Sequence, residues 1–155
     1  MSEHVAKIEW HRGVSDDFSN NTFSRAHRWH FDGGTIIDAS PSPYIVPLPL
    51  SVEAFVDPEE AFIASLSSCH MLTFLTIAAK RKYTVDSYID NAVGLLDSKE
   101  MGKKWVSRVT LYPEVTFSGS HQPSFEQNKK LHQLAHQHCF IANSVLTDIV
   151  IKPVF

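Results

Sequence analysis

One long apolar segment that opens with a strong helix-start signal constrains this chain most. It begins as "DPEEAFIASLSSC" at residues 57–69 and stays apolar to about residue 81. Asp57 can cap a helix, Pro58 suits the first helical position, and Glu60 completes an Asp-x-x-Glu capping box. Because the segment is apolar nearly all round, we expect a helix over 58–81 that is buried on most sides.

The same segment raises the question of a membrane span, since residues 61–79 are nearly uncharged. Its serines, threonines and His70 favour a helix buried in protein, so we expect no membrane partner. The N-terminus "MSEHVAKIEW" carries charges and no apolar run of the secretory type. We therefore expect a cytoplasmic protein whose two cysteines are kept reduced, without a permanent structural disulfide.

Length and composition indicate a single globular domain over residues 1–155. The chain is 43% hydrophobic and carries a formal net charge of −3, which favours neither a disordered chain nor a nucleic-acid partner. Alternating side chains predict three early strands near 4–12, 22–31 and 35–40, with "DGG" at 32–34 as a hairpin turn. Four prolines in 40–56 exclude a helix or central strand there, so this apolar loop is expected to cover a pocket or a partner chain.

The second half of the chain repeats the strand and helix signals. Two antiparallel strands are predicted at 85–97 and 104–119, joined by the polar "SKEMGK", with Pro113 at an edge or a bulge. A second helix is predicted over 124–140 and a final strand over 146–155. The expected fold class is α+β, with about six strands in antiparallel sheets packed on a long central helix and a second helix.

Cys69 stands in the middle of the long helix among small residues, where a core would usually place leucine. The ordinary interpretation is a small buried side chain. A nucleophilic role would need the thiolate, and a mid-helix thiol receives no help from the helix N-terminus, so a cation is required. Arg25 is our candidate, because the strand alternation puts it on one face with Trp29 and Phe31, whereas Arg28 points the other way.

The motifs around the two cysteines resemble those of the osmotically inducible protein C/organic hydroperoxide resistance (OsmC/Ohr) family. The matching residues are "DPEE" at 57–60, the small-residue run to Cys69, and the second cysteine that starts "CFIANS" at 139–144. The order of the predicted elements is also similar to that of the family over nearly the whole chain. The resemblance implies an intertwined homodimer with an OsmC-like fold.

The resemblance further implies thiol-dependent reduction of organic hydroperoxides, with Cys69 as the peroxidatic cysteine and Cys139 as the resolving one. Glu59 would hold the assisting arginine, which some members supply from the early strand region, where Arg25 lies. No metal or bound cofactor is implied. The cysteine pair would form a reversible disulfide that an external dithiol, such as that of a lipoyl-bearing protein, reduces.

Helix geometry predicts how the site is assembled. Glu59 and Cys69 are ten residues apart, which corresponds to about 15 Å of helical rise, so they lie far apart on one helix. We therefore expect an obligate twofold homodimer with composite sites. Each site would combine Cys69 and Cys139 of one chain with Glu59 and Arg25 of the other.

Two other hypotheses remain open. A metal site would use His70, His136, His138 and Cys139, whose soft donors suit zinc or copper. A second alternative keeps the fold without catalysis, as a dimeric thiol sensor or a small-ligand-binding OsmC-like protein.

Overall fold

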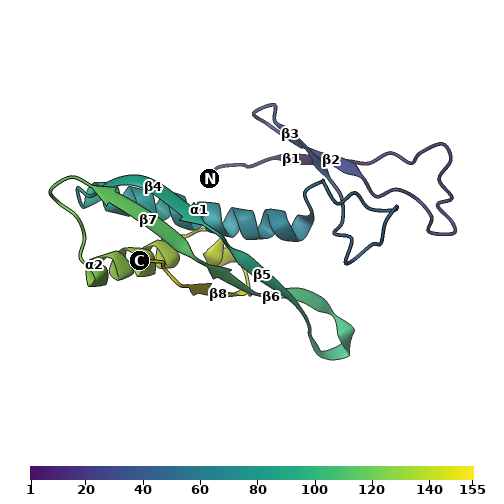
Figure 1. Cartoon of the computed structure of the whole chain (residues 1–155). Helices are drawn as coiled ribbons and strands as arrows, with labels where there is room; N and C mark the ends of the chain where they lie inside the picture. The colour runs from purple at the N-terminus through teal and green to yellow at the C-terminus, as the bar shows by residue number, and fades with distance from the viewer. The chain divides into compact units, whose positions relative to one another are not determined.

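The computed structural model describes residues 1–155, which divide into two compact units, Met1–Ala61 and Phe62–Phe155 (Figure 1). The first unit contains three strands and the first turn of a long helix. The second unit contains the rest of that helix, five strands and a second helix. That the two units form the single domain predicted over 1–155 stays a prediction.

The first unit holds a three-stranded antiparallel sheet in the order β1-β2-β3. Its strands are β1 (Ala6–Glu9), β2 (His27–Phe31) and β3 (Ile36–Ala39). The predicted turn at 32–34 is confirmed: Gly34 has a φ of +86° and donates its N–H to Phe31 O at 3.0 Å. The sequence pattern was wrong about Arg25, which precedes β2 and donates its backbone N–H to Leu50 O at 3.0 Å.

The proline-rich segment 40–56 forms turns and no helix or strand, as predicted. The buried Ser40 fixes its return path, because its hydroxyl accepts the Val52 N–H at 2.8 Å and its own N–H donates to Val56 O at 3.0 Å. A hollow of about 420 Å³ lies between this segment and the residues that start the long helix. The segment therefore covers a recess within its own unit.

Helix α1 (Pro58–Lys80) confirms the predicted helix within one residue. Its capping box is formed, since Glu60 N–H donates to Asp57 Oδ1 at 2.7 Å and Asp57 N–H donates to Glu60 Oε2 at 3.1 Å. By length and mean hydropathy, 1.6 over its most apolar window, α1 could cross a membrane, but core helices of soluble proteins meet the same two criteria.

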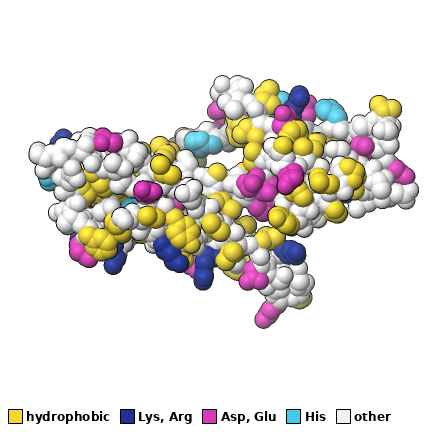
Figure 2. Space-filling model, viewed as in Figure 1, with side chains coloured by type: hydrophobic (Ala, Val, Ile, Leu, Met, Phe, Trp, Pro, Cys, Tyr) yellow, Lys and Arg dark blue, Asp and Glu magenta, His cyan; other side chains and the backbone are white.

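Burial of α1 on most sides is not found within one chain. The chain covers a single stripe at a spacing of four, made of Leu66, His70, Phe74 and Ala78. Leu72, on another side of the helix, is 58% exposed. Exposed hydrophobic side chains are frequent elsewhere too, and Figure 2 shows many of them on the visible face.

The second unit contains two small sheets where the sequence predicted two long strands. Strand β4 (Thr84–Asp90) pairs with β7 (Pro113–Ser118), and β5 (Val93–Ser98) pairs with β6 (Lys104–Leu111), both antiparallel. Strand β8 (Asp148–Ile151) is parallel to β6. The molecule therefore has eight strands in three sheets rather than about six.

Asp90 explains why each of the two predicted long strands is divided into two shorter strands. Its carboxylate accepts the Tyr112 backbone N–H at 2.6 Å and also the Ser67 hydroxyl from α1. Tyr112 is the residue between β6 and β7, so its N–H bonds to a side chain instead of continuing a ladder. Both long strands are therefore broken at the point where Asp90 links them to α1 by hydrogen bonds. Pro113 begins β7 directly after this break.

Helix α2 (Phe125–His138) is shorter than predicted and ends before Cys139. Ser124 caps it, and Gln127 completes a capping box. Two buried clusters form the core of this unit: Phe74, Ala78, Tyr83, Leu131 and Ala135 in one, and Leu66, Val109 and Leu111 in the other. Both clusters include residues of α1, which is therefore the element that joins them.

Candidate functional site: a thiol pair between α1 and the end of α2

Cys69 lies at mid-length on α1 and is half-buried. Its carbonyl accepts a hydrogen bond from the Thr73 hydroxyl at 2.8 Å, in addition to its backbone hydrogen bond within the helix. The neighbouring Ser67 hydroxyl donates to Asp90, and the Ser65 hydroxyl donates to Phe62 O at 2.8 Å. Both serine hydroxyls therefore have hydrogen-bond partners within the chain.

Cys139 is the C-cap residue directly after α2, and it is only 1% exposed. Its N–H donates to His136 O at 3.4 Å. The short 3-10 turn Ala142–Ser144 follows, and the Ala142 N–H donates to Cys139 Sγ at 3.4 Å. The helix end and the turn together hold the sulfur in place.

The fold brings the two cysteines into contact although they are 70 positions apart in the sequence. Both are free thiols. Burial raises the pKa of Cys139 to about 11, and a hydrogen bond with the Cys69 thiol contributes in the same direction. Two free thiols that lie this near each other can form a disulfide once one of them is oxidised.

Arg25 is half-buried in the first unit and has no carboxylate partner in the chain. Its guanidinium donates to Phe23 O at 2.8 Å and to the side chain of Asn21. It also lies over the Phe23 ring, with Cζ 4.1 Å from the ring centroid. The cation is therefore oriented without being neutralised by an acidic side chain.

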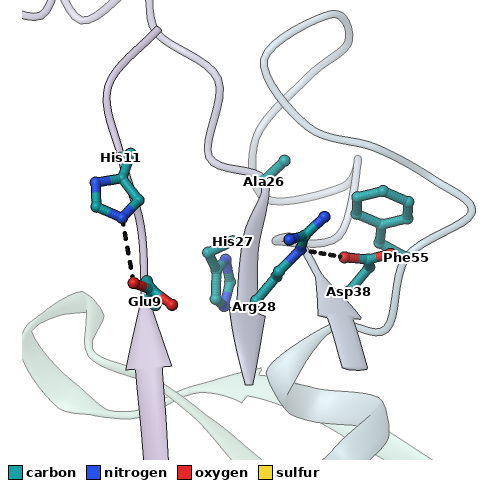
Figure 3. A pocket seen from close by; sticks show the side chains of 7 residues that line it. All are labelled: Glu9, His11, Ala26, His27, Arg28, Asp38 and Phe55. Carbon is teal, nitrogen blue, oxygen red and sulfur yellow. Dashed lines mark hydrogen bonds and ion pairs between the residues drawn. The ribbon is translucent and has the colours of Figure 1, made fainter. Parts of the chain in front are cut away.

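Arg28, the weaker candidate, is already paired. Its Nε donates to Asp38 Oδ1 at 3.1 Å across β2 and β3, and Figure 3 shows this pair beside a polar hollow of about 480 Å³. Glu9 and His11 form a second pair at the same hollow, with 3.3 Å between Oε1 and Nε2. Arg28 thus belongs to an exposed surface network of charges.

Glu59 lies in the first turn of α1 and is half-buried, without an ion pair in the chain. The expected pair between Glu59 and Arg25 is therefore not made within one chain. Both residues belong to the first unit, whereas Cys69 and Cys139 belong to the second. Their meeting in an assembled dimer stays a prediction.

The alternative metal set is not assembled. No three His, Cys, Asp or Glu side chains lie close enough together to hold a metal ion. His70 instead turns to His132 on α2, with 3.1 Å between His70 Nε2 and His132 Nδ1.

This buried histidine pair was not predicted from the sequence. The two rings are parallel, with an interplanar angle of 2°, and His132 also stacks on Phe74 with centroids 4.3 Å apart. Burial lowers the pKa of His70 to about 3 and that of His132 to about 4, so both are neutral. The only sequence signal was position: His132 follows Leu131 and precedes Ala135 on the buried face of α2.

Comparison with known proteins identifies the family. The OsmC-like protein family profile matches residues 53–153. An OsmC-like protein of unknown function from Vibrio cholerae has a structure that is 58% identical in sequence, with a TM-score of 0.96 over 99% of this chain and 100% of that one. No curated protein matches the chain.

More distant structures share the fold alone. An organic hydroperoxide resistance protein OsmC from Legionella pneumophila is 14% identical, with a TM-score of 0.65 over 99% of this chain and 96% of that one. The organic hydroperoxide resistance protein OhrB of Bacillus subtilis is 18% identical, with a TM-score of 0.64 over 97% of this chain and 98% of that one. The match to the family profile covers well over half of the sequence and includes both cysteines, so the chain belongs to the OsmC-like protein family.

Proposed function

We propose that the protein is a thiol-dependent peroxidase that reduces organic hydroperoxides in defence against oxidative stress. The contact between the Cys69 and Cys139 thiols carries this proposal. A single cysteine could be a small core residue, but two free thiols from distant parts of the chain that meet at a half-exposed position suit a redox cycle. Membership of a family whose distant relatives are named organic hydroperoxide resistance proteins supports the same chemistry.

The cycle uses the two thiols in sequence. The Cys69 thiolate attacks the distal peroxide oxygen, the O–O bond breaks, and the leaving alkoxide takes a proton and departs as an alcohol. Cys69 is then a sulfenic acid. The Cys139 sulfur attacks the Cys69 sulfur, the S–O bond breaks, and water leaves as the disulfide forms. An external dithiol reduces this disulfide by exchange and is itself oxidised to a disulfide.

The difference in burial supports these roles. Cys69 is half-buried and can be reached by a substrate, whereas Cys139 is 1% exposed and carries a raised pKa, so it is protected from direct oxidation. A lipoyl-bearing protein of the cytoplasm is the proposed source of the reducing dithiol, because its two thiols can complete the exchange intramolecularly.

A second copy of the chain completes the proposed site. Arg25 has no acidic partner in its own chain, and Glu59 has no basic one, so each is free to pair in an assembly. Much of the apolar surface of α1 is also uncovered, as the 58% exposure of Leu72 illustrates. We infer a homodimer in which Glu59 and Arg25 of one chain serve the cysteines of the other.

Thiol titration tests the redox cycle. The reduced protein is treated with one equivalent of cumene hydroperoxide, and its free thiols are counted before and after. Loss of two thiols, restored by dihydrolipoamide, is the expected result, and Cys139→Ser should stop at a sulfenic acid on Cys69. A protein that keeps both thiols under these conditions is not a peroxidase, and slow loss of a single thiol would instead indicate a thiol sensor.

Mixed dimers test the composite site. Cys69→Ser and Glu59→Ala subunits are each expected to be inactive alone, and exchange between them should restore part of the peroxidase activity. Each mixed dimer would then contain one intact site. Arg25→Met should slow the reaction with peroxide, and Arg28→Met serves as the matched control because Arg28 is paired with Asp38. Equal effects of the two arginine variants would refute the assignment of Arg25.

A further inference from the structure

A recess in the Phe62–Phe155 unit lies between α2 and the C-terminal residues and has a volume of about 290 Å³. One side is apolar, formed by Ile149 and Ile151 of β8, by Pro153, and by the rings of Phe125 and Phe155, whose centroids are 4.3 Å apart. Its size is at the lower end of the range for small-molecule sites, so it suits a ligand smaller than a typical drug.

The other side of the recess is polar and comes from one face of α2. Lys129, His132, Gln133 and His136 line it at helical spacing, and no acidic side chain does. Lys129 is exposed, whereas His132 is only 2% exposed. The recess therefore combines an apolar wall with a cationic and hydrogen-bonding wall.

His132 leaves one ring nitrogen unused at this recess. Its Nδ1 faces His70 on α1, 3.1 Å from His70 Nε2, while its Nε2 is buried and has no hydrogen-bond partner in the chain. The two nitrogens of an imidazole direct their bonds away from each other, so Nε2 points away from α1. A buried polar group without a partner is costly unless something else satisfies it.

The histidine pair determines what kind of group would satisfy Nε2. Both rings are neutral, so one of them donates and the other accepts in the bond between them. If His70 donates, His132 carries its proton on Nε2 and needs an acceptor, and His70 Nδ1 keeps only an unused lone pair. If His132 donates, His70 carries an unsatisfied buried N–H at Nδ1. Unsatisfied lone pairs are the better tolerated of the two, so an acceptor in the recess gives the better-satisfied arrangement.

We propose that this recess binds a small carboxylate with an apolar chain, whose carboxylate accepts the His132 Nε2–H and lies near Lys129, while its chain packs on Ile149, Ile151 and Phe155. The absence of acidic lining residues favours an anion over a cation. His70 then acts as a positioning residue, because its hydrogen bond fixes the tautomer of His132. His70 directly follows Cys69 on α1, so the residue that fixes the His132 tautomer is the sequence neighbour of one member of the thiol pair.

Calorimetric titration with sodium octanoate tests the site in the whole 155-residue chain, with 1-octanol as the neutral probe of equal chain length. Octanoate should bind at least about tenfold more tightly than octanol, because a hydrogen bond to a charged group is lost in the alcohol. Lys129→Gln should weaken octanoate binding about two- to fivefold, as expected for an exposed ion pair. Lys130→Gln, the adjacent exposed lysine that does not line the recess, should leave it unchanged.

Two substitutions of His132 separate the ligand contact from the structural pair. Asparagine places its amide near the position of Nδ1, so His132→Asn can keep the partner of His70 while it removes the group that faces the recess. His132→Gln places its amide near the position of Nε2. The asparagine variant should lose octanoate binding at least about tenfold, and the glutamine variant should retain more of it.

If both His132 variants unfold, a measurement on the unsubstituted protein still tests the proposal. The ¹⁵N chemical shift of His132 Nε2 should change on saturation with octanoate and take the value of a protonated ring nitrogen. Octanol binding as tightly as octanoate, no octanoate binding at millimolar concentration, or an unprotonated Nε2 with octanoate bound would each overturn the proposal.

Discussion

Cys139 should be an unusually unreactive thiol while it is reduced. Its side chain is 1% exposed, and burial, with a further contribution from the Cys69 thiol, raises its pKa from the ordinary 9.0 to about 11. Only the thiolate reacts with alkylating agents. Each pKa unit is a factor of ten in the thiolate fraction, so at neutral pH this fraction should be about 100-fold lower than in an ordinary cysteine.

A Cys69→Ala variant isolates Cys139 for measurement. Burial, the larger cause, survives this substitution, so the alkylation rate with iodoacetamide should rise about tenfold per pH unit and level off only above pH 9. The Cys139→Ser variant, which reports on Cys69, and the urea-unfolded protein provide the comparisons. Restricted access can slow the reaction but does not move its pH midpoint. A rate that levels off at or below pH 9 would therefore refute the reasoning.

Three further predictions concern the stability of the fold. Asp57→Ala should lower the free energy of unfolding in urea by about 1 kcal/mol through loss of the α1 cap, with Asp57→Asn nearly silent. Phe74→Ala, at a side chain with no exposed surface, should cost about 3–5 kcal/mol in the same assay. Burial depresses the pKa of His70 to about 3 and that of His132 to about 4, so unfolding takes up two protons below pH 6.5. Stability should be fully present above that pH and fall by several kcal/mol as the pH drops to about 4, and a flat profile over this range would contradict it.

The starts of the two helices were predicted well because they are encoded locally. Asp57 and Glu60 bond to each other's backbone within one turn, and Ser124 and Gln127 repeat the arrangement at α2. Such signals depend on residues three positions apart, which the sequence displays directly. The same holds for the hairpin turn at Gly34.

The strand breaks were not predicted because their cause is tertiary. Asp90 interrupts two strands by bonding to the Tyr112 backbone 22 positions away and to Ser67 of α1. Arg25 was misplaced for a related reason: its alternation with Trp29 suggests a strand, but its N–H is taken by Leu50 of the proline-rich segment. Periodicity in the sequence shows which side chains share one face of an element. It does not show which hydrogen-bond partners from elsewhere in the chain compete for the backbone of that element.

The candidate site likewise has one part that was predicted from the sequence and one part that was not. The resemblance pointed to Cys69 and Cys139 as a pair, and the structure has them in contact. Nothing in the sequence pattern paired His70 with His132, because their bond joins positions 62 apart and depends on how α1 packs against α2. Histidines on an apolar face are usually satisfied core residues, so such a pair becomes visible only when the packing is known.

The position of Cys69 on α1 explains why the helix carries a cysteine there. The buried stripe of α1 includes His70, and successive residues of a helix are about 100° apart, so Cys69 lies at the border of that stripe. A leucine at this position would fill the space at the border of the buried stripe. It also has no group that could act as a nucleophile. A thiol at the border can contact Cys139 on the buried side and still meet a substrate from the uncovered side. The half-buried position therefore supports Cys69, rather than Cys139, as the thiol that meets the peroxide.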